Sequence, residues 1–121
     1  MAADGAELFA AYWRCAKPKA AVLIVHGYAE HCLRYAPLAR VLNDAGYTVS
    51  AYDHRHHGQS PGELGYIARF DALIDDLDEV VEQFRAQTAN LPLFIFAHSM
   101  GGLVTANYLV RYKPANLRGA V

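Results

Sequence analysis

The 121-residue sequence has the composition of a folded globular protein with nearly balanced charge. Hydrophobic residues make up 54% and charged residues 19%, which excludes a disordered chain, and the length suits one domain rather than two. The formal net charge of −1 gives no electrostatic reason to expect nucleic acid or an anionic membrane as a partner.

Extended apolar runs and helical apolar spacing alternate along the chain. Runs of strand-forming residues predict strands at residues 8–13, 21–25, 47–52 and 93–96, with the start of another at 119–121. Apolar spacing predicts helices over residues 35–45, 70–84 and 99–112. Gly46 suits the end of the first helix, and Pro114 follows the last one. A loop rich in Gly and Pro is expected over residues 53–65.

This alternation predicts an α/β fold, a three-layer α/β/α sandwich with a mostly parallel sheet. Reactive groups in such sheets gather beyond the C-terminal ends of the strands. We therefore expect residues 26–28, residues 53–55 and Ser99 to meet at one edge of the sheet.

Targeting signals and disulfides are not evident. The first residues do not look like a signal peptide, and no apolar run is long enough for a transmembrane segment. Cys15 and Cys32 have no C-x-x-C spacing and cannot build a disulfide framework. We expect a cytoplasmic protein.

Residues 93–103 are predicted to form a strand, a sharp turn and a helix, with Ser99 on the turn. The small residues Ala97 and Gly101 allow strand and helix to pack closely around a strained serine, whose hydroxyl is pushed outward. The N–H of Met100, at the start of the helix, is free to donate to a developing oxyanion. The pattern also allows a plain strand and helix in which the glycines merely ease the turn.

Three blocks in one order extend this motif: His26-Gly27-Tyr28-Ala29-Glu30-His31 with Arg34-Tyr35, then Asp53-His54-Arg55-His56-His57-Gly58-Gln59-Ser60, and Leu91-Pro92-Leu93 leading into His98-Ser99-Met100-Gly101-Gly102. Together they resemble the monoacylglycerol lipase and lysophospholipase branch of the α/β-hydrolases, also described as serine-aminopeptidase-like hydrolases. Ala97 stands where the nucleophile elbow usually has its first Gly.

The resemblance implies a carboxylic ester hydrolase that needs no cofactor and no metal. Ser99 would form an acyl-enzyme with a small-molecule ester or lipid such as a monoacylglycerol or lysophospholipid. The backbone N–H groups of Tyr28 and Met100 would form the oxyanion hole. The residues expected to shape the elbow and its neighbouring loop are His26, Gly27, Ala97, His98, Gly101 and Gly102. Peripheral contact with lipid stays open.

The proton-transfer groups of such an enzyme are not found after Ser99. In this fold the acid and the histidine follow the nucleophile in the sequence, but residues 100–121 contain no Asp, Glu or His. We therefore expect residues 1–121 to be a single partial domain, truncated after the elbow helix, lacking the lid and the C-terminal half, and inactive alone. Two alternatives are a non-catalytic binding protein of the same fold and a module completed by a second chain.

Other titratable clusters favour structural roles. The grouped His54, His56 and His57 suggest a metal site, but no Cys or carboxylate spacing resembles a zinc site, so loop shaping is preferred. His56 replaces a Gly usual in the family, and a positive φ there would cost strain. The acidic residues of the second helix fit a solvated face better than a cation site: Asp75, Asp78, Glu79 and Glu82.

Overall fold

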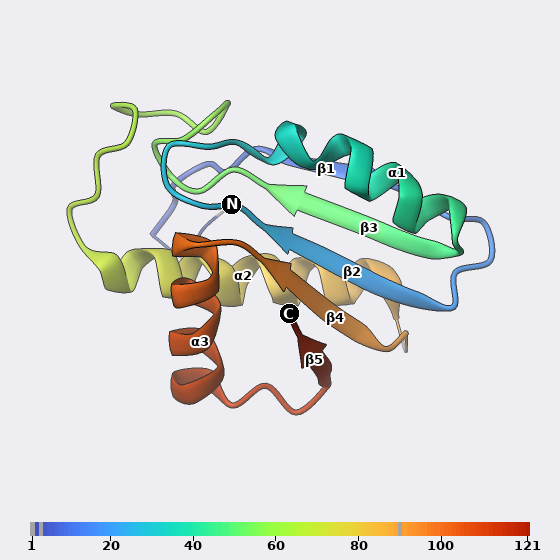
Figure 1. Cartoon of the computed structure of the whole chain (residues 1–121). Coiled ribbons are helices and arrows are strands. Elements are labelled where there is room, and N and C mark those ends of the chain that lie inside the picture. Colours follow the sequence, from blue (N-terminus) through green and yellow to red (C-terminus); the bar gives the residue numbers. More distant parts are fainter. Residues whose placement is uncertain (1, 3, 90) are drawn as a thin grey trace.

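A five-stranded sheet organises the computed structural model, which describes residues 2, 4–89 and 91–121. The elements in chain order are β1 (Ala10–Trp13), β2 (Ala20–Val25), the 3₁₀ helix η1 (Cys32–Tyr35), α1 (Ala36–Asp44), β3 (Tyr47–Tyr52), α2 (Phe70–Thr88), β4 (Leu93–Ala97), α3 (Met100–Tyr112) and β5 (Leu117–Ala120). The strand order is β1-β3-β2-β4-β5 (Figure 1). β1 pairs with β3 antiparallel, and the β3–β2, β2–β4 and β4–β5 pairs are parallel. The predicted mostly parallel sheet is confirmed.

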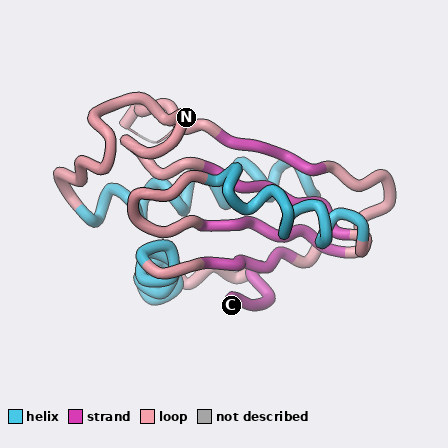
Figure 2. The backbone as a smooth tube through the Cα atoms, turned by 45° about the horizontal axis from the view of Figure 1, so that its top comes forward, coloured by secondary structure: helices cyan, strands magenta, loops and turns pink. Residues whose placement is uncertain are grey.

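Helices cover both faces of this sheet (Figure 2). On one face, Ala39 of α1 packs in a core cluster with Ile24 and Val49. On the opposite face, α2 and α3 bury Leu77 and Val104 in a larger cluster that includes strand residues of β2, β3 and β4. The predicted three-layer arrangement follows from these two cores, because each helix buries one apolar stripe against a strand surface.

The central strand β2 brings the predicted functional blocks to one edge. All six of its residues are buried, as expected for a parallel strand covered on both faces. Val25, its last residue, is level with Tyr52 at the end of β3 and with Ala97 at the end of β4. The segments that follow the three strands therefore leave the sheet side by side, and α3 begins at this edge (Figure 1).

Several boundaries differ from the sequence prediction. β1 begins at Ala10 rather than at residue 8, and the carbonyl of Phe9 accepts a hydrogen bond from the Asp53 N–H at 2.8 Å. β5 begins at Leu117, two positions before the expected start, because Leu117 already pairs with Leu93. α3 ends at Tyr112 as predicted, where Lys113 takes a left-handed conformation with φ 46°.

The polar side of α2 is more engaged than its pattern suggested. Asp76 is buried and accepts two hydrogen bonds of 2.7 Å from Arg55, a bidentate pair between the helix and the loop after β3. The predicted acidic face is partly solvated, and Asp75 accepts a 2.6 Å hydrogen bond from the Tyr112 hydroxyl of α3. Across the described residues, no trio of His, Cys, Asp and Glu is arranged to hold a metal ion.

Candidate active site

Ser99 lies exposed on the sharp turn between β4 and α3. Its φ of 55° and ψ of −118° fall in a region that residues with a side chain rarely adopt, which costs about 1–3 kcal/mol. Hydrogen bonds on both sides hold this conformation: His98 N–H donates to Val25 O at 3.1 Å, and Leu103 N–H donates to Ser99 O at 3.1 Å. The serine is thus fixed in a strained backbone with its side chain facing outward.

Close backbone approach explains one of the two glycines after the serine. A Cβ on Gly101 would lie 2.4 Å from the carbonyl oxygens of both Val25 and His26, so only glycine lets α3 start against the end of β2. A Cβ on Gly102 would meet nothing within 4 Å. Both were expected to shape the elbow, and the steric requirement falls on Gly101.

The turn after β2 lies directly against the elbow. A Cβ on Gly27 would come within 3.2 Å of His98 O and 3.3 Å of the Ser99 Cβ, so the two turns touch at this glycine. Within the described chain, no protein acceptor is found for the N–H groups of Tyr28 and Met100. Met100 is the first residue of α3, where helical N–H groups lack partners. The two N–H groups expected to bind an oxyanion therefore belong to adjoining turns and are available to a ligand.

The Tyr28 side chain ties its turn to the loop that follows β3. Its hydroxyl donates to the Gly65 carbonyl at 2.9 Å, and its ring meets the His57 ring edge to face with centroids 5.4 Å apart. A cavity of about 420 Å³ separates the two segments. It is lined by Tyr28, Ala29, Glu30, His31, His56, His57, Gly58, Leu64 and Gly65. This hollow lies beside the candidate oxyanion donor.

The buried imidazole rings of His26 and His54 form hydrogen bonds that hold the backbone of the turn after β2. His54 N–H donates to His26 Nε2 at 3.0 Å, which leaves His26 Nδ1 to carry the hydrogen that Gly27 O accepts at 2.6 Å. His54 Nε2 in turn donates to His26 O at 2.8 Å. Burial lowers the pKa of His26, and burial together with the nearby His26 lowers the pKa of His54 to about 3. Both rings are neutral at pH 7, and their nitrogens serve the loop backbone.

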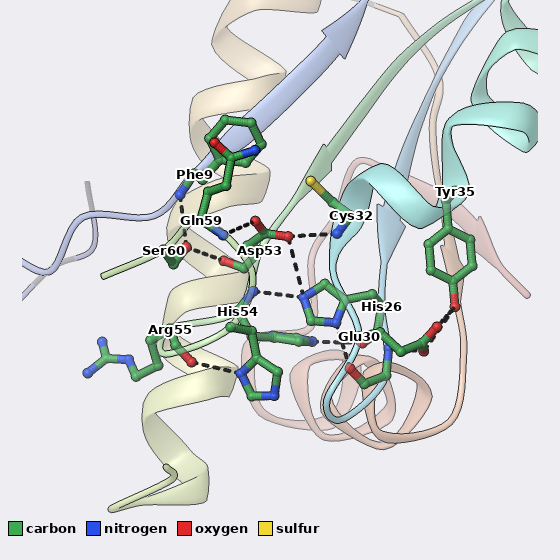
Figure 3. Close-up of polar contacts among 12 residues, drawn as sticks. Phe9, His26, Glu30, Cys32, Tyr35, Asp53, His54, Arg55, Gln59 and Ser60 are labelled. Atoms are coloured by element: carbon green, nitrogen blue, oxygen red, sulfur yellow. Dashed lines mark hydrogen bonds and ion pairs between the residues drawn. The ribbon is translucent and has the colours of Figure 1, made fainter. Parts of the chain in front are cut away.

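Asp53 is the anchor of the loop after β3, a role that the sequence motif did not reveal. Its two carboxylate oxygens accept hydrogen bonds from the N–H groups of Cys32 at 2.6 Å and Gln59 at 2.7 Å (Figure 3). Ser60 Oγ donates to Asp53 O at 2.8 Å. A Cβ on Gly58, which has φ 50°, would overlap the carboxylate. The sequence signal that could have indicated this hydrogen-bond network is the spacing of Asp53, Gly58 and Ser60.

His56 has φ 61°, a left-handed backbone conformation that residues with a side chain rarely adopt. Its ring stacks on Tyr66 with centroids 5.8 Å apart, and the absence of a side chain on Gly62 gives the ring its space. The strained position is therefore supported by packing within the same loop.

His98 extends from the elbow toward the turn after β2. The side chain is 62% exposed, and its Nδ1 lies 3.1 Å from Glu30 Oε2. Glu30 also accepts from the Gly27 N–H at 2.8 Å, so one carboxylate contacts both turns. Glu30 stands in the block that begins at His26, but no local sequence signal indicates this contact with His98.

Comparisons with known proteins agree with this geometry. A family described as "Serine aminopeptidase, S33" matches residues 16–121. The chain belongs to this family. Monoglyceride lipase of Homo sapiens is 38% identical over 120 residues, an alignment that covers 98% of this chain and 39% of that protein. The predicted resemblance to the monoacylglycerol lipase and lysophospholipase branch is confirmed.

Solved structures place the fold among the α/β-hydrolases. A thermostable carboxyl esterase from Bacillus coagulans superposes with a TM-score of 0.88 at 29% identity, over 99% of this chain and 41% of that one. A monoacylglycerol lipase from Paleococcus ferrophilus gives a TM-score of 0.76 at 33% identity, over 94% of this chain and 41% of that one. The chain thus spans about two-fifths of the length of these relatives. In the part of the chain that the structure describes, no helix is long and apolar enough to cross a membrane.

Proposed function

We propose that Ser99 is the nucleophile of a carboxylic ester hydrolase that acts on monoacylglycerols, lysophospholipids or similar esters. The observation that carries this proposal is the exposed, strained serine on a turn that touches the Gly27 turn, with the unpartnered Tyr28 and Met100 N–H groups beside it. The substrate class is supported by the names of the relatives, which include monoglyceride lipases and a carboxyl esterase.

The reaction proceeds through an acyl-enzyme. Ser99 Oγ adds to the ester carbonyl carbon while its proton passes to a base, and the carbonyl oxygen becomes an oxyanion. The N–H groups of Tyr28 and Met100 donate to that oxygen, and each such donor contributes on the order of a hundredfold in rate. The intermediate expels the alcohol, which takes the proton from the base. Water then adds to the carbonyl of the acyl-enzyme and gives a proton to the base, and the acid is released as Ser99 Oγ takes that proton back.

The base and its acid partner are proposed to come from sequence beyond these 121 residues or from a second chain. The buried His26 and His54 rings donate hydrogen bonds to backbone carbonyls and have lowered pKa values. Neither is therefore suited to accept the serine proton. His98 directly precedes Ser99 in the sequence, and its Nδ1 lies 3.1 Å from Glu30 Oε2, so its ring is directed toward the turn after β2. Without a base, a serine hydroxyl is a weak nucleophile, and losing a triad member in a serine protease has cost on the order of a millionfold.

Reaction with a fluorophosphonate probe tests the nucleophile directly. We expect slow, stoichiometric labelling of the purified chain that peptide mass spectrometry maps to Ser99. Ser99→Ala abolishes it, whereas the matched control Ser50→Ala, which removes a hydroxyl inside β3, retains it. Equal labelling of Ser99→Ala contradicts the assignment, and fast labelling of the chain alone contradicts an external base.

Hydrolysis assays test the substrate class once the histidine and acid are supplied. A panel of a monoacylglycerol, a lysophospholipid and a triacylglycerol separates the proposed small esters from bulkier lipids. Release of fatty acid from the first two, dependent on Ser99, is expected. Ligand binding without any ester cleavage would favour the non-catalytic member of the fold.

A further inference from the structure

Glu30 is a mostly buried carboxylate that gathers donors from three parts of the site. Its side chain is 11% exposed, and it accepts hydrogen bonds from the Gly27 N–H at 2.8 Å and from His98 Nδ1 at 3.1 Å. It also accepts one from the Tyr35 hydroxyl at 3.0 Å (Figure 3). The Arg34 side chain is 67% exposed, and its Nη1 lies 3.5 Å from Glu30 Oε1. Hydrogen bonds to an ionised carboxylate are about twice as strong as neutral ones.

Two of these bonds join the segments that carry the candidate oxyanion donors. Gly27 immediately precedes Tyr28, and His98 stands two positions before Met100. Glu30 Oε2 accepts from both Gly27 and His98. A single oxygen atom therefore links the two turns, although Glu30 and His98 are 68 residues apart in the sequence.

The packing around Gly27 makes this link rigid. A Cβ on Gly27 would lie 2.5 Å from Glu30 Oε2 on one side and 3.2 Å from His98 O on the other. The Glu30 carboxylate therefore lies so close to the backbone of Gly27 that no side chain larger than hydrogen fits at this position. Losing it frees the Gly27 N–H and removes one side of this contact.

The charge state of Glu30 suits such a link. Burial on its own raises the pKa of the carboxyl, but the donors from His98, Gly27 and Tyr35 together outweigh burial and leave the pKa below its usual value. The group is therefore ionised at neutral pH.

We propose that Glu30 is a positioning residue for the ester hydrolysis inferred above: its carboxylate fixes the Gly27 turn to the elbow and so sets the spacing between the Tyr28 and Met100 N–H groups. This inference rests on the proposed function, because the spacing matters only if an oxyanion forms beside Ser99. Glu30 itself does not touch the reacting atoms. It acts through the backbone of the two turns.

Glu30→Gln tests the proposal, with Arg34→Gln as the matched control. The first keeps the shape of the side chain and removes its charge, whereas the second removes the exposed charge partner of the same carboxylate without touching either turn. In ¹H–¹⁵N spectra of the folded chain, Glu30→Gln is expected to move the Gly27 amide proton upfield and to shift the Tyr28 and Met100 cross-peaks. Arg34→Gln is expected to leave these three peaks in place.

Labelling rates supply the functional reading. Normalised to the folded fraction, Glu30→Gln is expected to slow fluorophosphonate reaction at Ser99 on the order of tenfold or more, and Arg34→Gln to change it less than twofold. His98→Ala, at an exposed side chain where folding is not at stake, cuts only the elbow side of the link and slows the reaction by a smaller factor. The double variant Glu30→Gln/His98→Ala is expected to be no slower than Glu30→Gln alone, because both remove one link.

The outcomes separate this proposal from the one it rests on. Wild-type rates in Glu30→Gln, with unmoved Tyr28 and Met100 peaks, would overturn the role of Glu30 and leave Ser99 as nucleophile. A wild-type chain that never reacts at Ser99 would overturn the proposed function. In that event the Tyr28 and Met100 peaks alone decide whether Glu30 sets the two turns.

Discussion

Gly101 and Gly102 are neighbours in the first turn of α3, yet they meet different surroundings. A Cβ on Gly101 would lie 2.4 Å from two carbonyl oxygens and 2.9 Å from the Val25 carbonyl carbon, whereas one on Gly102 would lie in open space. Because the atoms facing Gly101 belong to the backbone of β2 and its following turn, they cannot rotate aside. Gly101→Ala must therefore move α3 away from the sheet.

The two substitutions are expected to change the free energy of unfolding in opposite directions. Overpacking costs about 1–3 kcal/mol, and backbone contacts place Gly101→Ala near the upper value. Replacing a helical glycine by alanine returns about 1 kcal/mol, which leaves Gly101→Ala destabilised by about 2 kcal/mol. Gly102→Ala gains the same helix term without the clash, so it is stabilised by up to about 1 kcal/mol. The two variants should differ by about 3 kcal/mol.

Urea unfolding followed by circular dichroism measures this difference. With slopes of about 1–3 kcal/mol per molar urea for small proteins, the midpoints of the two variants should lie about 1–3 M apart, with the wild type between them. Each variant is the control of the other, because both add one methyl group to adjacent positions of one helix. Equal midpoints would refute the close contact between α3 and the end of β2.

Two further predictions follow from buried groups. The lowered pKa values of His26 and His54 mean that the unfolded chain takes up protons near pH 6.5 while both rings resist protonation in the folded chain. Stability is therefore full above pH 6.5 and falls below it, by about 1.4 kcal/mol per pH unit for His54 down to its folded pKa of about 3, with a further loss from His26 in the same direction. Urea midpoints between pH 8 and pH 5 check this, and a flat profile would contradict neutral buried rings. Burial and the nearby Asp53 raise the pKa of the Cys32 thiol, so Ellman's reagent should titrate the partly exposed Cys15 in the folded chain and reach Cys32 only on unfolding; rapid reaction of both thiols would contradict the burial of Cys32.

Local sequence signals predicted the scaffold of the site well. The apolar run before Ser99 and the small residues after it indicated a strand, turn and helix, and the end of α3 at Tyr112 followed from the nearby Pro114. The buried β2 was recognised because a parallel strand covered on both faces has a continuous apolar pattern. These features depend on neighbours in the sequence, which is why the sequence alone was sufficient.

Contacts between distant segments were beyond the sequence argument. The link from Glu30 to His98 joins residues on separate turns, and the burial of Asp76 depends on a loop arginine that no helical periodicity reveals. Likewise, nothing in the dipeptide Gly101-Gly102 distinguishes the glycine that touches β2 from the one that faces open space. Each of these is a property of how elements meet rather than of the elements themselves.

The most direct test of the account is the position of the phosphoryl oxygen after Ser99 has been phosphonylated. The structure of this adduct should show that oxygen within hydrogen-bond distance, about 2.7–3.1 Å, of both the Tyr28 and the Met100 nitrogen atoms. An adduct on another side chain, or an oxygen that turns to solvent away from both N–H groups, would contradict the assignment of Ser99 and its two backbone donors.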